Sequence, residues 1–85
     1  MSKMWYLYVV RCADGSLYTG VTTNLARRLH EHNFTKRGAK YTRSRRPVEM
    51  VWSKEYHDRS SAQSAEYNFK KLVHKQKLEI ITQDE

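Results

Sequence analysis

Residues 5–22 read WYLYVVRCADGSLYTGVT, and this stretch decides the fold. Residues 5–12 and 17–22 are rich in β-branched and aromatic side chains, a composition typical of β-strands. Residues 13–15 (ADG) fit a three-residue hairpin loop in which Gly15 takes the left-handed conformation. The stretch therefore predicts an antiparallel β-hairpin.

The loop also predicts the register of the two strands. In the register that a three-residue loop imposes, Tyr8 lies opposite Gly20 and Val10 lies opposite Tyr18. Side chains alternate between the two faces of a sheet, so one face is expected to carry Tyr6, Tyr8, Tyr18 and Gly20.

A helix and a third strand are predicted after the hairpin. Residues 24–33 predict a helix with Thr23 or Asn24 as its N-cap. Residues 48–56 (VEMVWSKEY) alternate between apolar and polar side chains and predict the strand. The intervening residues 35–47 are expected to be irregular.

The C-terminal part of the chain is expected to be helical. Residues 60–63 (SSAQ) match a capping box, which predicts a helix through about residue 73. A short helix over roughly 74–80 and a frayed tail over 82–85 follow. The apolar face of the capped helix is expected to carry Ala62, Ala65, Phe69, Leu72 and Val73.

The size of the chain predicts one domain, spanning residues 1–85, with room for one modest core. Cys12 is the only cysteine, so it cannot form an intramolecular disulfide and is expected to pack inertly. No apolar stretch is long enough for a signal peptide or a membrane span. We therefore expect a cytoplasmic protein with no membrane partner.

The positive charge of the chain is concentrated in one segment. The net charge is +7, and residues 36–46 contain no acidic residue. A solvated charged loop is the ordinary explanation. However, Gly38, Tyr41 and Thr42 add backbone N–H groups, a ring that can stack and a hydroxyl, which favours contact with nucleic acid. The candidate binding residues are Lys36, Arg37, Lys40, Tyr41, Arg43, Arg45 and Arg46.

The first helix carries polar residues on its apolar stripe. Leu25 and Leu29 define the stripe, and Arg28 and His32 fall on it, whereas Glu31 lies on the opposite, polar face. Arg28 could lie at the edge of the stripe with its guanidinium in solvent. Alternatively, Arg28 and His32 line a groove that holds an anion.

Glu66 is the corresponding feature of the next predicted helix, because it lies on the shoulder of the apolar face. It could simply pair with Lys70 one turn later. A carboxylate and a guanidinium that converge on one groove would suit a metal ion and a phosphate respectively.

Other kinds of site do not fit the sequence. His30 and His32 are two residues apart on a helix and point in different directions, so they do not make a zinc pair. The three glycines form neither a P-loop nor a dinucleotide-binding fingerprint.

Taken together, these residues resemble the signature of the GIY-YIG nuclease superfamily. Residues 6–8 (YLY) and 18–20 (YTG) are similar to its two tyrosine motifs, with Tyr6 in place of the usual first glycine. Arg28 and Glu66 match the catalytic arginine and the metal-binding glutamate of the family. The resemblance spans about residues 4–80.

The segment after the first helix narrows this resemblance. Residues 38–43 (GAKYTR) and 46–51 (RPVEMV) are similar to two GIY-YIG subgroups. One contains small stand-alone bacterial proteins of the uncharacterised UPF0213 group, and the other is the nuclease subunit of a branched-DNA endonuclease. The short chain favours the UPF0213 group.

The resemblance implies an α+β fold, with a small three-stranded antiparallel sheet flanked by helices, and hydrolysis of phosphodiesters with one Mg²⁺ or Mn²⁺. It implies that Glu66 holds the metal and that Arg28 clamps the scissile phosphate. Tyr8 and Tyr18 would position or deprotonate the attacking water, without deciding between them, and His32 would be an additional acid or base. With one carboxylate, the metal is expected to bind weakly.

The leading hypothesis is a metal-dependent endonuclease that acts on DNA with little sequence specificity, because phosphate contacts position a protein without reading bases. The alternatives are a non-catalytic nucleic-acid-binding module and a basic surface for an acidic protein or membrane lipid. The sequence predicts no obligate protein partner. It leaves open the preferred DNA structure and the choice between DNA and RNA.

Overall fold

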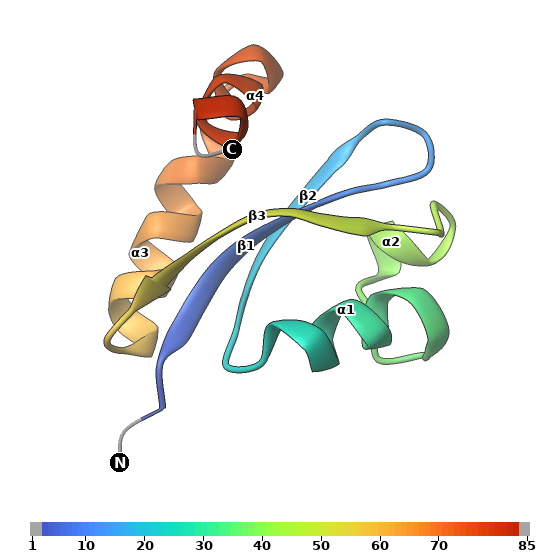
Figure 1. Ribbon diagram of the computed structural model, residues 1–85, viewed down its shortest axis with the longest axis horizontal. Coiled ribbons are helices and arrows are strands. Elements are labelled where there is room, and N and C mark those ends of the chain that lie inside the picture. The colour runs from blue at the N-terminus through green and yellow to red at the C-terminus, as the bar shows by residue number, and fades with distance from the viewer. Residues whose placement is uncertain (1–2, 84–85) are drawn as a thin grey trace.

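The computed structural model describes residues 3–83, in which three antiparallel strands form one sheet (Figure 1). The strands are β1 (Trp5–Arg11), β2 (Leu17–Thr22) and β3 (Glu49–Tyr56). The spatial order is β2-β1-β3, so β1 pairs with both of the others. All three predicted strands are present.

Helices cover both faces of this sheet (Figure 1). One face packs against α1 (Leu25–Phe34) and the one-turn helix α2 (Lys40–Arg43). The other face packs against α3 (Arg59–Lys70) and α4 (His74–Gln83). The predicted α+β fold, a three-stranded antiparallel sheet flanked by helices, is confirmed.

The hairpin has the predicted register. Tyr8 pairs with Gly20 and Val10 pairs with Tyr18, and Gly15 in the loop has φ +86°. A Cβ atom on Gly20 would lie 2.6 Å from the Tyr8 hydroxyl oxygen, so the phenol ring lies directly over this glycine. The absence of a side chain at residue 20 therefore makes room for Tyr8 on the α1 face.

Alternation along β1 divides the core into two clusters, one on each face of the sheet. On the α1 face, Tyr8 and Val10 pack with Cys12 and Val48. Burial raises the pKa of the Cys12 thiol, which agrees with its predicted inert role. On the α3 and α4 face the buried residues are Leu7, Val9, Phe69 and Ile81.

The helix caps are partly as predicted. Asn24 caps α1 and accepts a hydrogen bond from the Arg27 amide at 3.0 Å. The capping box predicted at residues 60–63 is wrong, because Asp58 caps α3 by accepting from the Ser61 amide at 2.7 Å. The helix starts at this aspartate, whose side chain binds the third helical residue, rather than at the predicted serine.

The ends of the C-terminal helices also differ from the prediction. Because α3 ends at Lys70, Val73 is not on its apolar face and is 63 % exposed. α4 extends to Gln83, so Thr82 and Gln83 are helical rather than frayed, while residues 84–85 lie outside the described part of the chain. Within residues 3–83, no helix is both long and apolar enough to cross a membrane.

The segment predicted to be irregular is more ordered than expected. It contains α2, and its remaining residues are fixed against α1 and the hairpin. The Ala13 amide donates to the Arg45 carbonyl at 2.9 Å, and a Cβ atom on Gly38 would lie 2.6 Å from the Glu31 carbonyl oxygen. These long-range contacts hold α2 against the α1 face.

Candidate active site

Three polar side chains are joined by hydrogen bonds beneath the α1 face. Tyr8 Oη lies 2.7 Å from His32 Nε2, and His32 Nδ1 lies 3.0 Å from Thr42 Oγ1. Each of the three residues is at most 1 % exposed. Such burial is tolerated because every polar atom has a partner. Both ring nitrogens of the buried His32 are engaged, by Tyr8 and by Thr42, and its role as an additional acid or base stays a prediction.

Arg28 extends this group towards the surface. Its Nε donates to the Tyr8 hydroxyl oxygen at 3.3 Å, and its Nη1 donates to Glu31 at 3.0 Å and to the Arg37 carbonyl at 2.9 Å. The Arg28 side chain is 23 % exposed, so its guanidinium is held from below and open to solvent above. The guanidinium of Arg28 is therefore not simply solvated at the edge of the apolar stripe of α1.

Tyr18 completes the group from β2. Its ring makes an edge contact with His32, with centroids 5.4 Å apart, and stacks with Tyr41 at 6.0 Å. The Arg45 guanidinium lies 3.9 Å from the centre of the Tyr41 ring and also pairs with Asp14 at 3.1 Å. Tyr41 and Arg45 therefore link the hairpin loop and α2 to Tyr18.

Glu66 approaches from α3, which packs along β1 and β2. Its side chain is 21 % exposed and forms the ordinary ion pair with Lys70, at 3.3 Å. Burial raises the pKa of Tyr8 to about 12; Arg28 opposes this shift, whereas Tyr18 and Glu66 add to it. The Glu66 charge thus acts on the same phenol that Arg28 and His32 contact.

His32 is neutral in this environment. Burial lowers its pKa to about 4, and the nearby guanidinium groups of Arg28 and Arg46 act in the same direction while Glu31 opposes them. The values for Tyr8 and His32 place their shared proton on the phenol at neutral pH. The free protein therefore holds Tyr8 as a neutral phenol.

The chain matches a known protein family. The profile of the GIY-YIG catalytic domain matches residues 4–79, which is most of the chain. The chain belongs to the GIY-YIG family.

Individual GIY-YIG relatives come from the UPF0213 group. The chain is 51 % identical, over 95 % of its length and 74 % of the relative's, to UPF0213 protein DP2720 of Desulfotalea psychrophila. It is similar to the solution structure of UPF0213 protein BH0048 from Bacillus halodurans, with a TM-score of 0.60, 37 % identity and coverage of 93 % and 83 % of the two chains. For protein EF2693 from E. faecalis the TM-score is 0.63, the identity 47 % and the coverage 94 % and 85 %.

Family membership suggests a broad class of chemistry. GIY-YIG domains belong to a nuclease family, so the implied substrate is a nucleic acid, and GIY-YIG nucleases are generally metal-dependent. The UPF0213 name itself assigns no activity. In this GIY-YIG chain Tyr6 stands at the usual first glycine, and its hydroxyl lies 3.4 Å from Glu55 on β3.

The basic segment of this GIY-YIG chain is not uniformly available to a ligand. Arg46 was expected to bind nucleic acid, but its guanidinium turns inward and caps the C-terminal end of α1. It donates to the His32 carbonyl at 2.6 Å and also contacts the Thr35 carbonyl. The cause is the set of unpaired carbonyls at a helix C-terminus, which attract a cationic donor.

The other basic residues of the segment differ in the same way. Arg45 and Tyr41 are engaged with each other, so they too are positioned by the fold. By contrast, the side chains of Lys36, Arg37, Lys40 and Arg43 are exposed and form no ion pair within residues 3–83. These four remain the candidates for phosphate contact.

The carboxylates of the site can supply only few protein ligands to a metal ion. No cluster of three or more His, Cys, Asp or Glu side chains that could hold a metal occurs among residues 3–83. Glu66 offers one carboxylate as a metal ligand, whereas the Glu31 carboxylate is paired with Arg28. One carboxylate supplemented by water and substrate phosphate is a coordination that Mg²⁺ accepts. The residues therefore fit a hydrated divalent cation.

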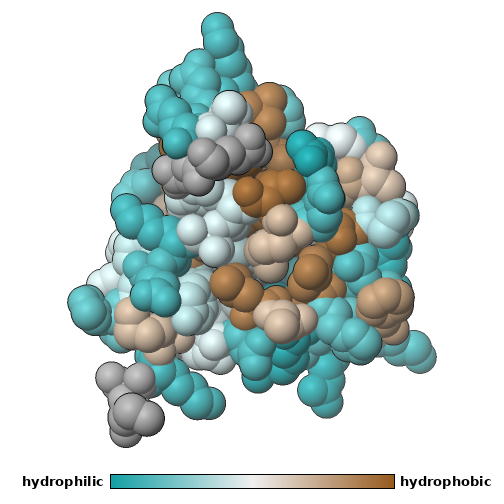
Figure 2. Space-filling model, viewed as in Figure 1, coloured by the Kyte–Doolittle hydropathy of each residue, from teal (hydrophilic) through white to brown (hydrophobic). Residues whose placement is uncertain are grey.

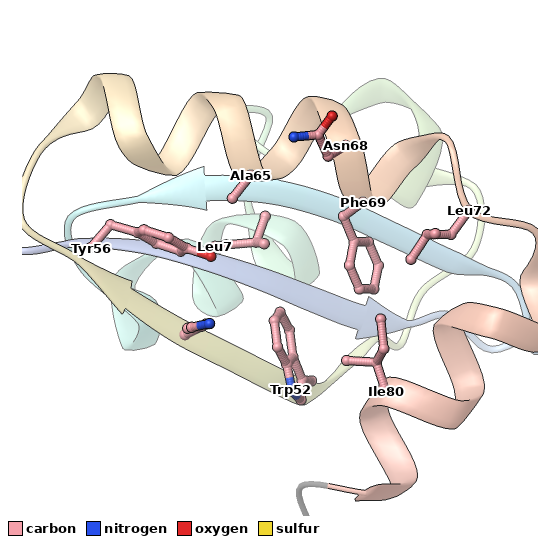
Figure 3. A pocket seen from close by; sticks show the side chains of 9 residues that line it. Leu7, Trp52, Tyr56, Ala65, Asn68, Phe69, Leu72 and Ile80 are labelled. Atoms are coloured by element: carbon pink, nitrogen blue, oxygen red, sulfur yellow. The ribbon is translucent and has the colours of Figure 1, made fainter.

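A hollow of about 340 Å³ lies away from this site, between β3 and helices α3 and α4 (Figure 3). Figure 2 shows apolar side chains gathered on that side of the molecule. Leu7, Trp52, Phe69 and Ile80 line it with other mostly apolar residues. It contains none of the candidate catalytic groups.

Two contributors to the site were not predicted. Glu31 was expected on the polar face, yet its side chain is only 16 % exposed because it turns towards Arg28 three residues earlier. That spacing was a usable signal. Thr42 was considered only as part of the binding segment, and no local pattern indicated that it would contact His32.

Proposed function

We propose that this protein hydrolyses phosphodiester bonds in DNA with one divalent cation, Mg²⁺ or Mn²⁺. Arg28 binds the scissile phosphate, Glu66 binds the cation, and Tyr8 and Tyr18 hold the attacking water. The observation that carries the proposal is the contact group of Tyr8, Arg28, His32 and Tyr18, on which the charge of Glu66 also acts.

Arg28 is suited to phosphate because only part of its guanidinium is engaged. Nε and Nη1 are bound by protein oxygens, while Nη2 has no hydrogen-bond partner within residues 3–83. The bound nitrogens fix the plane of the guanidinium and leave Nη2 for an oxygen anion. A fixed donor stabilises charge as it develops on the pentacoordinate phosphorus, without reorganising during the reaction.

Glu66 is suited to hold a weakly bound cation. Lys70, its partner in the free protein, is an exposed surface residue, so the ion pair exchanges readily for a cation. When bound there, the cation would withdraw charge from a phosphate oxygen and lower the pKa of bound water. Part of its ligand set would come from water and from the phosphate itself.

The two tyrosines differ in their access to water. Tyr18 is half-buried, whereas Tyr8 is buried and keeps its proton, with a pKa of about 12. Tyr8 therefore needs a nearby positive charge before it can accept a proton from water. Arg28 already provides part of this charge, and a cation at Glu66 would remove the opposing effect of the carboxylate.

The exposed basic residues suit a protein that binds the phosphate backbone of DNA. Lys40 and Arg43 lie on α2, and Lys36 and Arg37 lie between α1 and α2, in the segment that Thr42 ties to His32. Lysine and arginine contacts to phosphate give affinity and orientation without base specificity. We infer that cutting depends on DNA structure rather than on sequence. A non-catalytic module that binds DNA through the same residues is the alternative.

Labelled DNA incubated with Mg²⁺ or Mn²⁺ tests the proposal. The panel contains duplex, single strand, flap and four-way junction, and binding is measured on the same substrates. We expect cleavage of at least one structure. Glu66→Gln is expected to reduce the rate by about 10²-fold or more while binding persists, because one metal ligand is lost.

Glu79→Gln is the matched control, since it removes the same charge from an exposed position on α4. It is expected to cleave like the parent. Binding without any cleavage by the parent protein would select the binding module. Equal cleavage by the parent and Glu66→Gln would rule out the proposed metal site.

A further inference from the structure

A continuous hydrogen-bonded chain runs from Arg28 to the backbone of the segment before α2. Arg28 Nε lies 3.3 Å from Tyr8 Oη, which lies 2.7 Å from His32 Nε2. His32 Nδ1 lies 3.0 Å from Thr42 Oγ1, which lies 2.9 Å from the Ala39 carbonyl oxygen. Three elements of the fold, β1, α1 and α2, and the residue that precedes α2 thus meet in one line of polar atoms.

The Thr42 end of the chain indicates the direction of the protons within it. Arg28 Nε–H can only donate, so Tyr8 accepts there and its own proton is available for His32 Nε2. At the far end the Ala39 carbonyl can only accept, so Thr42 donates to it and must accept from His32 Nδ1. The Thr42 end therefore implies a proton on His32 Nδ1, and Tyr8 can then donate to the unprotonated Nε2.

We propose that Thr42 is a positioning residue that holds His32 in the Nδ1–H tautomer and thereby orients Tyr8 and Arg28. The proposal rests on the proposed function where it concerns catalysis, because Arg28 is the group that would hold phosphate. Thr42 itself lies two hydrogen bonds from Tyr8 and is fully buried, so it touches no substrate.

A second contact at His32 explains why Thr42 is needed. The Ala39 amide points at Nδ1 from 3.4 Å and would favour the opposite tautomer, with the proton on Nε2. The contact with Thr42 is the shorter of the two, at 3.0 Å, which favours Nδ1–H. Without the Thr42 hydroxyl, the Ala39 amide is the remaining partner of Nδ1. Nε2–H would then donate to the phenol oxygen, and the Tyr8 O–H would have to rotate away from His32.

The surroundings of the ring make the tautomer the relevant variable. Two tyrosines face the His32 ring, Tyr8 from β1 and Tyr18 from β2. The nearby charged groups are Arg28, Glu31 and Arg46. Burial and the two guanidinium groups keep the pKa of His32 low, at about 4. At neutral pH the ring is therefore uncharged, and its state is a choice between two neutral tautomers.

Nitrogen NMR of the His32 ring tests this inference without any nuclease assay. Long-range ¹H–¹⁵N spectra of protein labelled on histidine distinguish a protonated Nδ1 from a protonated Nε2. We expect Nδ1–H in the parent protein and in Thr42→Ser, which keeps the hydroxyl. We expect a shift of the proton to Nε2 in Thr42→Val, which is close in shape but cannot accept the bond.

Thr19→Val is the matched control, because Thr19 is also buried and lies on β2. It is expected to leave His32 in the parent tautomer. An Nε2–H tautomer in the parent protein, or an unchanged tautomer in Thr42→Val, would overturn the inference. Because the parent spectrum is itself decisive, the test holds even if a variant folds poorly.

A kinetic readout connects the tautomer to the proposed activity. We expect Thr42→Val to lower kcat by roughly 10²-fold, the scale on which a positioned acid–base group contributes, with KM nearly unchanged. Thr42→Ser should restore most of kcat. A shifted tautomer with an unchanged kcat would confine Thr42 to the fold and overturn its positioning role. Absence of cleavage by the parent would count against the proposed function and leave the NMR result intact.

Discussion

Arg28→Ala is expected to lower the rate of DNA cleavage by about 10³-fold, at the upper end of the effect of removing one preorganised donor. The guanidinium is held by Tyr8, Glu31 and the Arg37 carbonyl, so its free Nη2 is already oriented in the absence of substrate. Its loss removes positive charge where negative charge develops. Single-turnover cleavage at saturating protein measures this effect apart from binding.

Two further variants make the Arg28 experiment specific. Arg28→Lys keeps the charge but loses both the Nε–H donor to Tyr8 and the planar fork, so most of the defect should remain. Arg27→Ala removes the same charge from the adjacent position, where the side chain is 56 % exposed. It should weaken binding slightly and leave the single-turnover rate unchanged. Equal defects in Arg27→Ala and Arg28→Ala would reduce the role of Arg28 to general attraction.

Gly20→Ala is expected to lower the free energy of unfolding by about 2 kcal/mol, because overpacking a tight core site costs on the order of 1–3 kcal/mol. A Cβ atom at residue 20 would lie 2.6 Å from the Tyr8 oxygen and 2.8 Å from its Cζ. The ring cannot move aside easily, since His32 and Arg28 both bind its hydroxyl. Urea denaturation measures the stability, and cleavage should fall in the same variant.

The sign of the Gly20 effect is informative. Where the backbone tolerates it, replacing glycine by alanine stabilises a protein by about 0.4–1 kcal/mol through the unfolded chain. Gly20 does not have a positive φ, so only the contact with Tyr8 opposes this gain. In a Tyr8→Leu background the cost of Gly20→Ala should therefore shrink. An equal cost in both backgrounds would show that the phenol is not what Gly20 accommodates.

The fold could be predicted largely because local patterns carry it. The composition of residues 5–22 indicates two strands, and the length of their loop determines that Tyr8 faces Gly20. The same register puts Tyr8 and Tyr18 on the α1 face, beneath the stripe that carries Arg28 and His32. Hairpin geometry and helical spacing thus bring these four residues together.

The segment between α1 and β3 could not be predicted in this way. Its conformation depends on contacts with residues distant in sequence: Arg45 with Asp14, Arg46 with the end of α1, and Thr42 with His32. The sequence alone does not distinguish an arginine that caps a helix from an arginine that is free to bind phosphate. Only the positions of the unpaired carbonyls distinguish them.

Glu66 illustrates a different limit. Its spacing on the helix indicated both an ordinary ion pair with Lys70 and a place near the apolar face, and the structure contains the ion pair. Whether the carboxylate also faces Arg28 depends on how α3 packs along β1 and β2, which helical periodicity does not define. The charge of Glu66 contributes to the raised pKa of Tyr8, and a common site with Arg28 stays a prediction.

The most direct test is to locate Mn²⁺ on the folded protein by paramagnetic relaxation in NMR. The account predicts that low concentrations of Mn²⁺ selectively broaden the signals of Glu66, the Tyr8 and Tyr18 rings and the Arg28 Nε–H, and that Glu66→Gln removes this broadening. Broadening centred on another part of the surface, or unchanged in Glu66→Gln, would contradict the claim that Glu66 and Arg28 share one site.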